Sequence, residues 1–161
     1  MNSKLPAAYE TMQIPEALTL EHEELLAELN RAATIPGAVG IAARRVVRLC
    51  FTHFAKEEDS VFRIFGLLHD MASDRVHEDI ANANPTAAQI GSGRHAMRHA
   101  HPSIDAALSK LLREARRAKN KDIAELVRRI KDHERNEDET IYPLVLQIER
   151  TVRAGMEIKA T

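Results

Sequence analysis

The segment HFAKEEDSVF at residues 53–62 occurs a second time, in the same pattern, as HERNEDETIY at residues 133–142. Each copy has a histidine, a glutamate four residues later, a second acid directly after the glutamate, and then an aliphatic and an aromatic residue. Residues four apart lie on one face of an α-helix. Because the apolar residues keep the same helical spacing, each copy predicts a helix whose inward face carries an imidazole and a carboxylate.

Two further segments, one before each of these copies, also match each other, and their separation along the chain is almost the same. Each has a histidine, an aliphatic residue three positions later, and a leucine four positions after that. A pair of helices is therefore duplicated, and its polar positions repeat together with its core positions. The matching residues are His22, Leu25 and Leu29 in the first segment and His101, Ile104 and Leu108 in the second.

The apolar period of about 3.6 residues predicts four helices and no strand. We expect them at about 15–33, at about 39–68, through Ile104 to about Ala118, and from Ile123 to Ile148. Residues 70–94 form a long polar connection with room for a short helix. The fold class expected is an all-α, antiparallel up-down four-helix bundle. Among the residues expected to point inward are Ile41, Val47, Cys50, Val61, Ile64, Phe65, Leu68, Ile141, Leu144 and Ile148.

Length and composition suit one domain in a reducing compartment. The 161 residues predict a single domain with a core at about 15–150. A net charge of −1 gives no reason to expect nucleic acid or an anionic membrane as a partner. Cys50 has no second cysteine to pair with. Residues 1–18 have no signal-peptide pattern, and no run approaches the roughly 20 apolar residues of a membrane span. We therefore expect a cytoplasmic protein.

The four helices would bring four histidines and two glutamates into one interior. An unsatisfied buried polar group costs ~1–3 kcal/mol, and metal ligation is the simplest compensation. Imidazole and carboxylate suit iron, manganese or zinc. Two carboxylates among four histidines favour two ions about 3.5–4 Å apart, with open positions left on both. The candidate ligands are His22, His53, Glu57, His101, His133 and Glu137.

A less specific interpretation exists for each piece of this pattern. One His-x-x-x-Glu pair is usually a surface pair worth a few tenths of a kcal/mol. A single inward histidine is more often a satisfied core or capping residue. The coincidence of four helices in one repeated register favours the metal site.

These residues resemble the hemerythrin-like, or HHE cation-binding, family. The matching elements are His22, HFAKE at 53–57, His101 and HERNEDETIYP at 133–143, so the resemblance extends over about 15–150. It implies a four-helix bundle around a non-haem di-iron centre, oxo- or hydroxo-bridged, that binds dioxygen or a related small oxidant. By matching positions, the four histidines would be terminal ligands and the two glutamates, Glu57 and Glu137, would be the bridges.

The third and fourth helices depart from the oxygen carriers of this family. The oxygen carriers have the pattern His-x-x-x-His in the third helix and the pattern His-x-x-x-x-Asp in the fourth. The chain offers both patterns, with His95 and His99 in the one and Asp138 after His133 in the other. The internal repeat favours His101 and Glu137 instead. The alternatives stay open: His99 or His95 could replace or join His101, and Asp138 could replace Glu137.

Four neighbours of the candidate ligands have weaker signals. Pro102 is comfortable only in the first turn of a helix or at a kink, so it predicts a helix start near His101. Glu58 and Asp138 are candidates for acceptors that orient imidazoles. For Tyr142 core packing is the interpretation preferred to a redox role.

The leading functional hypothesis is a di-iron protein that reversibly binds or senses dioxygen or nitric oxide. One rival is a di-iron enzyme that consumes peroxide or nitric oxide, and whether the protein is an enzyme is left open. Another is iron storage or delivery of the iron–sulfur repair type, although the extra cysteine-containing domain of repair proteins has no counterpart here. A structural zinc site needs only four ligands, and these six exceed it. The oligomeric state is open, with a homodimer as one option.

Overall fold

A computed structural model describes residues 16–59 and 84–159, with side chains for 16–59, 100–148, 150 and 151. Helix is the only regular structure within these residues, so the all-α prediction is confirmed. None of the described helices is both long enough and apolar enough to cross a membrane. The elements are α2 (Glu16–Ala33), α3 (Ala38–Glu57), α6 (Asn84–Arg117), α7 (Lys121–Asn136), the π-helical segment η2 (Glu137–Ile141) and α8 (Tyr142–Lys159).

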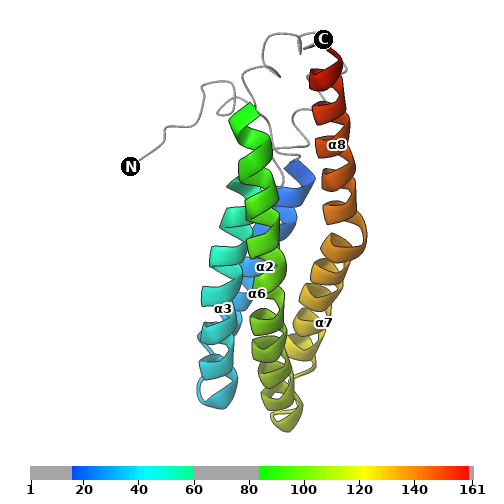
Figure 1. Ribbon diagram of the computed structural model, residues 1–161. Coiled ribbons are helices and arrows are strands. Elements are labelled where there is room, and N and C mark those ends of the chain that lie inside the picture. The colour runs from blue at the N-terminus through cyan, green and yellow to red at the C-terminus, as the bar shows by residue number, and fades with distance from the viewer. Residues whose placement is uncertain (1–15, 60–83, 160–161) are drawn as a thin grey trace, which may run out of the picture.

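The helices form the four columns of an antiparallel bundle (Figure 1). The first three columns are α2, α3 and α6, and the fourth is α7 continued through η2 into α8. Column α2 packs against α3 and α7, and α6 packs against the same two neighbours. The predicted four-helix bundle is therefore confirmed.

Two tight turns set the antiparallel pairs at one end of the bundle. Gly37 precedes α3 with φ 83°, a left-handed conformation that suits glycine. A Cβ at Gly40 would collide with the carbonyl oxygen of Ile35, so the helix can pack this closely on the turn only with glycine there. Before α7, the side chain of Asn120 accepts a hydrogen bond from the Ile123 amide at 3.1 Å. These turns hold α2 beside α3 and α6 beside α7.

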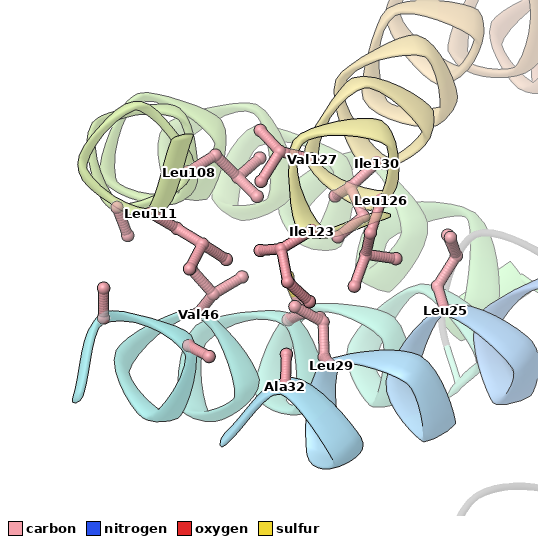
Figure 2. Close-up of a cluster of buried hydrophobic side chains, with 14 of the residues drawn as sticks. Leu25, Leu29, Ala32, Val46, Leu108, Leu111, Ile123, Leu126, Val127 and Ile130 are labelled. Carbon is pink, nitrogen blue, oxygen red and sulfur yellow. The ribbon is translucent and has the colours of Figure 1, made fainter. Parts of the chain in front are cut away.

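The core fills the bundle between these turns and the polar cluster described below. Leu29, Val46, Leu108 and Ile130 come from the four columns, and each is fully buried (Figure 2). Burying one such side chain contributes roughly 1.5–3 kcal/mol. The same inward stripes continue, further from the turns, into the histidine positions, so the apolar core also fixes the direction in which the histidines point.

Two residues expected in the core are exposed. Ile41 is 58% exposed because it lies two residues after the buried Val39, about 200° further round α3. Leu144 is 45% exposed, whereas Val145 is fully buried. The reason is η2, since a π-helical turn holds one residue more than an α-helical turn and shifts the inward position by one. The expectations for Val47, Cys50, Ile141 and Ile148 agree with the structure, Val47 being only half-buried.

The third column is longer than expected. Helix α6 begins at Asn84, so the later part of the connection expected at 70–94 is helical. Pro102 lies well inside this helix rather than in its first turn, and the predicted helix start near His101 is wrong. Pro102 is exposed, where water can satisfy the carbonyl that proline leaves without a donor. The expected core positions Val61, Ile64, Phe65 and Leu68 lie outside the described residues.

Candidate metal centre

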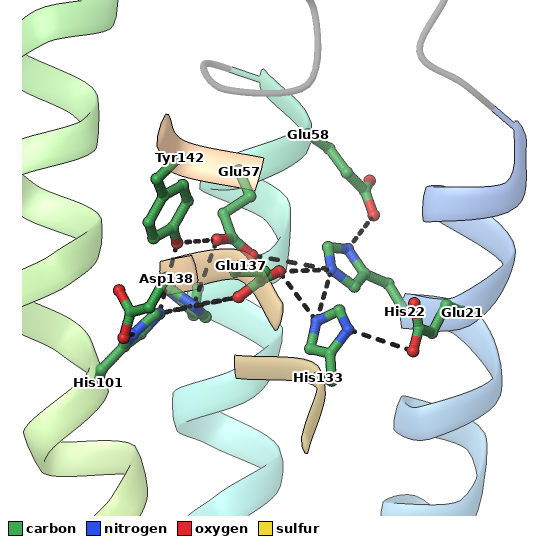
Figure 3. A network of polar contacts seen from close by, with 10 residues as sticks. Glu21, His22, Glu57, Glu58, His101, His133, Glu137, Asp138 and Tyr142 are labelled. Atoms are coloured by element: carbon green, nitrogen blue, oxygen red, sulfur yellow. Dashed lines mark hydrogen bonds and ion pairs between the residues drawn. The ribbon is translucent and has the colours of Figure 1, made fainter. Parts of the chain in front are cut away.

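Each column of the bundle contributes one histidine to a common interior cluster, and two glutamates join them (Figure 3). Glu57 is the last residue of α3 and Glu137 is the first of η2, and both are completely buried. Every histidine of the cluster is at most 8% exposed. The structure thus brings together all six residues singled out in the sequence: His22, His53, Glu57, His101, His133 and Glu137.

The first half of the cluster is built around His22 and His133. Their Nε2 atoms lie 3.2 Å apart. Oε1 of Glu137 lies 3.0 Å from Nε2 of His133 and 3.7 Å from Nε2 of His22. Oε2 of Glu57 lies 3.7 Å from Nε2 of His22. Two imidazole nitrogens and one oxygen from each carboxylate therefore face one another.

The second half has the same composition around His53 and His101. Their Nε2 atoms lie 3.0 Å apart. Here Glu57 contributes its other oxygen, Oε1, at 3.5 Å from Nε2 of His53. Glu137 contributes Oε2, at 3.9 Å from His53 and 3.8 Å from His101. Each glutamate is therefore shared between the two halves through its two oxygens.

These donors fit a pair of metal ions. The ligand atoms of each half all lie within 4.8 Å of one another. Neighbouring ligands about 2.1 Å from one ion lie about 3.0 Å apart, which is close to both Nε2–Nε2 distances. Oε2 of Glu57 and both carboxylate oxygens of Glu137 are buried and have no hydrogen-bond partner. Buried carboxylate oxygens without a partner are costly, and a cation would satisfy them.

Three of the four histidines have a carboxylate at their outer nitrogen, Nδ1. Such a partner orients the ring and makes Nε2 a better ligand. These contacts agree with the expected role of Glu58 and Asp138, whereas sequence analysis missed Glu21. The signal available for Glu21 was only its position next to His22. The pairs are His22 with Glu58 at 2.9 Å, His101 with Asp138 at 3.2 Å and His133 with Glu21 at 3.4 Å.

Asp138 is therefore directed at the outer edge of His101, not at the ligand atoms. Glu137 takes part in both halves of the cluster, and Asp138 in neither. The geometry does not favour the alternative in which Asp138 replaces Glu137. The side chains of His95 and His99 are outside the part of the chain whose side chains are described, so that alternative stays as it was.

Tyr142 belongs to the cluster as well as to the core. It is 2% exposed, and its hydroxyl donates a hydrogen bond to Oε1 of Glu57. The hydroxyl oxygen also lies 3.4 Å from Nε2 of His101, and the two rings stack with their centroids 5.8 Å apart. Core packing, the interpretation preferred from the sequence, describes only part of this role.

The two shared carboxylates differ in their acidity. Burial and repulsion from Glu137 raise the pKa of Glu57 well above its usual value, against the hydrogen bond from Tyr142, which lowers it. Burial would also raise the pKa of Glu137, but the imidazoles of His133, His22 and His53 hold it well below its usual range. Without metal, the cluster thus favours one protonated and one ionised carboxyl. Bound cations would let both ionise.

Two further titratable side chains lie close to the cluster without joining it. Glu134 is 7% exposed, and burial together with repulsion from Glu137 raises its pKa to about 8. Sequence analysis did not single it out. Cys50 is completely buried, and burial raises the pKa of its thiol. At neutral pH the thiol is therefore protonated, which suits the small buried hydrophobe expected there.

A four-helix bundle with two histidine pairs joined by two buried, shared carboxylates could hold metal ions in its interior. The chain belongs to the hemerythrin family, since the family model of the hemerythrin HHE cation binding domain matches residues 13–145. Comparisons with curated proteins and with solved structures found no match.

Proposed function

We propose that the protein is a non-haem di-iron protein that reversibly binds or senses dioxygen or nitric oxide. The observation that carries the proposal is the sharing of Glu57 and Glu137, each of which directs one oxygen to either histidine pair. A single ion would use one half of the cluster and leave the other histidine pair without a metal ion to bind. The symmetry of the two halves supports a pair of ions.

The ligand assignment follows the two halves. Imidazole and carboxylate ligands suit iron, and bound iron would supply the open coordination positions that a diatomic molecule needs. Glu57 and Glu137 would bridge the ions. One ion would be held by His22 and His133 and the other by His53 and His101.

Residues around the cluster keep it rigid and dry. The ring of Phe54 stacks flat on His22, with centroids 3.9 Å apart and an angle of 5° between the planes. Tyr142 covers the opposite half and holds Glu57 in place. A histidine-rich, carboxylate-poor site enclosed in this way supports binding or mild redox chemistry more than hydroxylation.

The setting proposed is the cytoplasm. One buried free cysteine suits a reducing compartment. The chain has a formal net charge of −1, which gives no reason to propose nucleic acid or an anionic membrane as a partner. The partner proposed is the small oxidant.

Anaerobic iron loading followed by elemental analysis and optical spectroscopy tests the proposal. We expect two irons per chain and a new near-ultraviolet band on exposure to air that reverses on deoxygenation. An irreversible band with sustained turnover of peroxide would favour the enzyme, and rapid loss of iron to a chelator would favour storage or delivery. Loading of fewer than two irons would contradict the di-iron assignment.

A further inference from the structure

The outer face of α3 carries exposed apolar and basic side chains. Phe51 is 64% exposed, and Ala55, one turn later, is exposed too. Arg48 is exposed on the same face, one turn before Phe51. Residues 38–55 contain no aspartate or glutamate. Exposed aromatic and arginine side chains together are typical of surfaces that bind other proteins.

The outer face of α2 carries exposed apolar side chains and the opposite charge. Leu20 is 48% exposed, and Glu23 and Ala27 follow it, both exposed, on the same side of the helix. Among aspartate, glutamate, lysine and arginine, α2 has only glutamates before Arg31. Within the described residues neither Glu23 nor Arg48 has an ion-pair partner, so both charges are available to another molecule.

These two faces lie at the same height of the bundle. Helix α2 packs against α3 as its antiparallel neighbour (Figure 1). The ring of His22 in α2 stacks on the ring of Phe54 in α3, so the residues around one are level with the residues around the other. Leu20 and Glu23 are therefore level with Phe51.

The two faces also point in the same direction, away from the other half of the bundle. On α2, Glu28 pairs with Arg129 of α7 at 2.6 Å, and Glu23 lies about 140° round the helix from Glu28. On α3, Arg44 lies two turns before Phe51 on the same side and donates to the carbonyl of Ala33, the last residue of α2, at 2.8 Å. Together they form one outer surface, the α2–α3 face. Its residues are Leu20, Glu23, Ala27, Arg48, Phe51 and Ala55.

We propose that the α2–α3 face binds a second copy of the chain in a twofold dimer, with α2 of one protomer opposite α3 of its partner. A twofold axis parallel to the helices produces this arrangement and keeps every residue at its own height. Phe51 then packs against Leu20 and Ala27 of the partner subunit, and Arg48 pairs with Glu23 of the partner subunit. Symmetry makes each of these contacts twice.

The charges of the two helices select this arrangement. A twofold axis across the helices would instead place α2 on α2 and α3 on α3. Glutamates would then meet glutamates and arginines would meet arginines, and like charges across an interface oppose association. Only the arrangement with α2 opposite α3 brings opposite charges together at both contacts.

The dimer forms from protomers that are already folded, because each bundle encloses its own apolar core. The apolar centre of the face is small, which suits a reversible dimer and not an obligate one. The inference goes beyond the proposed function and does not depend on it, since no residue of the α2–α3 face belongs to the histidine and glutamate cluster.

Sedimentation velocity over a series of protein concentrations measures the dissociation constant of the dimer. We expect a reversible equilibrium between monomer and dimer. Phe51→Asp should weaken association roughly tenfold or more, because it places a charge at the apolar centre of the contact. Leu144→Asp is the matched control, since Leu144 is 45% exposed on α8, outside the α2–α3 face. Its dissociation constant should match that of the unaltered protein, and circular dichroism checks the fold of each variant.

Exchange of the two charges tests which helices face each other. Arg48→Glu and Glu23→Arg should each weaken association roughly tenfold or more, because like charges then meet at both symmetric contacts. The double variant Glu23→Arg/Arg48→Glu restores opposite charges and should restore association. A monomer at every concentration, or a dimer that none of these changes weakens, would overturn the inference. A double variant as weak as the single variants would also overturn it.

Metal content, measured on the same samples, separates this inference from the proposed function. Two irons per chain in a protein that stays monomeric would overturn the dimer and leave the metal site standing. Failure to load two irons, with the dimer and its response to the charge exchange intact, would contradict the proposed function alone.

Discussion

Tyr142 donates a hydrogen bond to Glu57, a carboxylate shared by both histidine pairs. The bond joins the first helical residue after η2 to the end of α3, so it ties the fourth column to the second at the level of the cluster. It also breaks the symmetry of the two halves, since the tyrosine hydroxyl lies on the side of His101.

Tyr142→Phe should weaken metal binding while it leaves the bundle folded. The change removes the hydroxyl, whose hydrogen bond fixes Glu57 and lowers the pKa of that carboxyl. It keeps the ring that packs against His101. Loss of a partner that orients a metal ligand typically costs about 10–100-fold in metal affinity. Competition with a chelator measures the affinity, and circular dichroism serves as the control for folding. An unchanged affinity would show that the hydroxyl does not position Glu57.

Glu137→Ala should abolish loading of two metals, because this residue supplies an oxygen to each half of the cluster. His53→Ala should do the same by removing a ligand of one half. Both metal-free variants should stay helical, since the apolar core lies between the cluster and the turns. Glu139→Ala is the matched control, because Glu139 is exposed in the same π-helical segment. Two metals per chain in both cluster variants would refute the ligand assignment.

Glu134 should make the metal-free protein less stable as the pH rises. Its pKa is about 8 in the folded protein against a usual 4.5, so the folded state binds a proton between these values that the unfolded state has lost. The free energy of unfolding therefore falls from about pH 4.5 to about pH 8 by up to ~1.4 kcal/mol per unit. Glu134→Gln cannot ionise and should lack this part of the decline.

Urea denaturation of both metal-free proteins at pH 5 and pH 8 measures the effect of Glu134. The advantage of the Gln variant should be larger at pH 8, by a few kcal/mol. The difference between the two proteins isolates Glu134 from the other titratable residues, which are the same in both. An advantage that is the same at the two pH values would contradict the raised pKa.

Phe54→Ala should cost about 3–5 kcal/mol of stability, as is usual for truncation of a buried aromatic side chain. Phe54 is 1% exposed and forms one wall of the pocket around His22. Phe51, on the same helix, is 64% exposed, and Phe51→Ala should change stability by only about 0.5 kcal/mol. Thermal or urea denaturation of the two variants, side by side, checks the burial assignment. Similar losses from both would contradict it.

Cys50 should be unreactive in the folded protein. The side chain is completely buried and burial raises the pKa of the thiol, so little reactive thiolate forms. Iodoacetamide at pH 8 should label the chain only after denaturation, and mass spectrometry counts the label. Rapid labelling under native conditions would indicate an accessible thiolate and would contradict the burial assignment.

Local spacing was sufficient to predict most of the fold and the composition of the cluster. The step from His53 to Glu57, repeated from His133 to Glu137, is a property of a single helix and needs no partner to be recognised. The repeated register then assigned the same inward direction to His22 and His101. For these residues the sequence and the structure agree, because each lies in a regular α-helix or directly at its end.

The sequence by itself therefore determined the four helices, most of their inward positions as far as Glu137, and which residues meet in the cluster. Only the tertiary structure decided what happens beyond Glu137, where η2 adds a residue to the turn and directs Val145 inward instead of Leu144. It also decided that Tyr142 meets Glu57 and that Nδ1 of His53 has no hydrogen-bond partner. These contacts join different columns of the bundle, and helical periodicity describes only one column at a time.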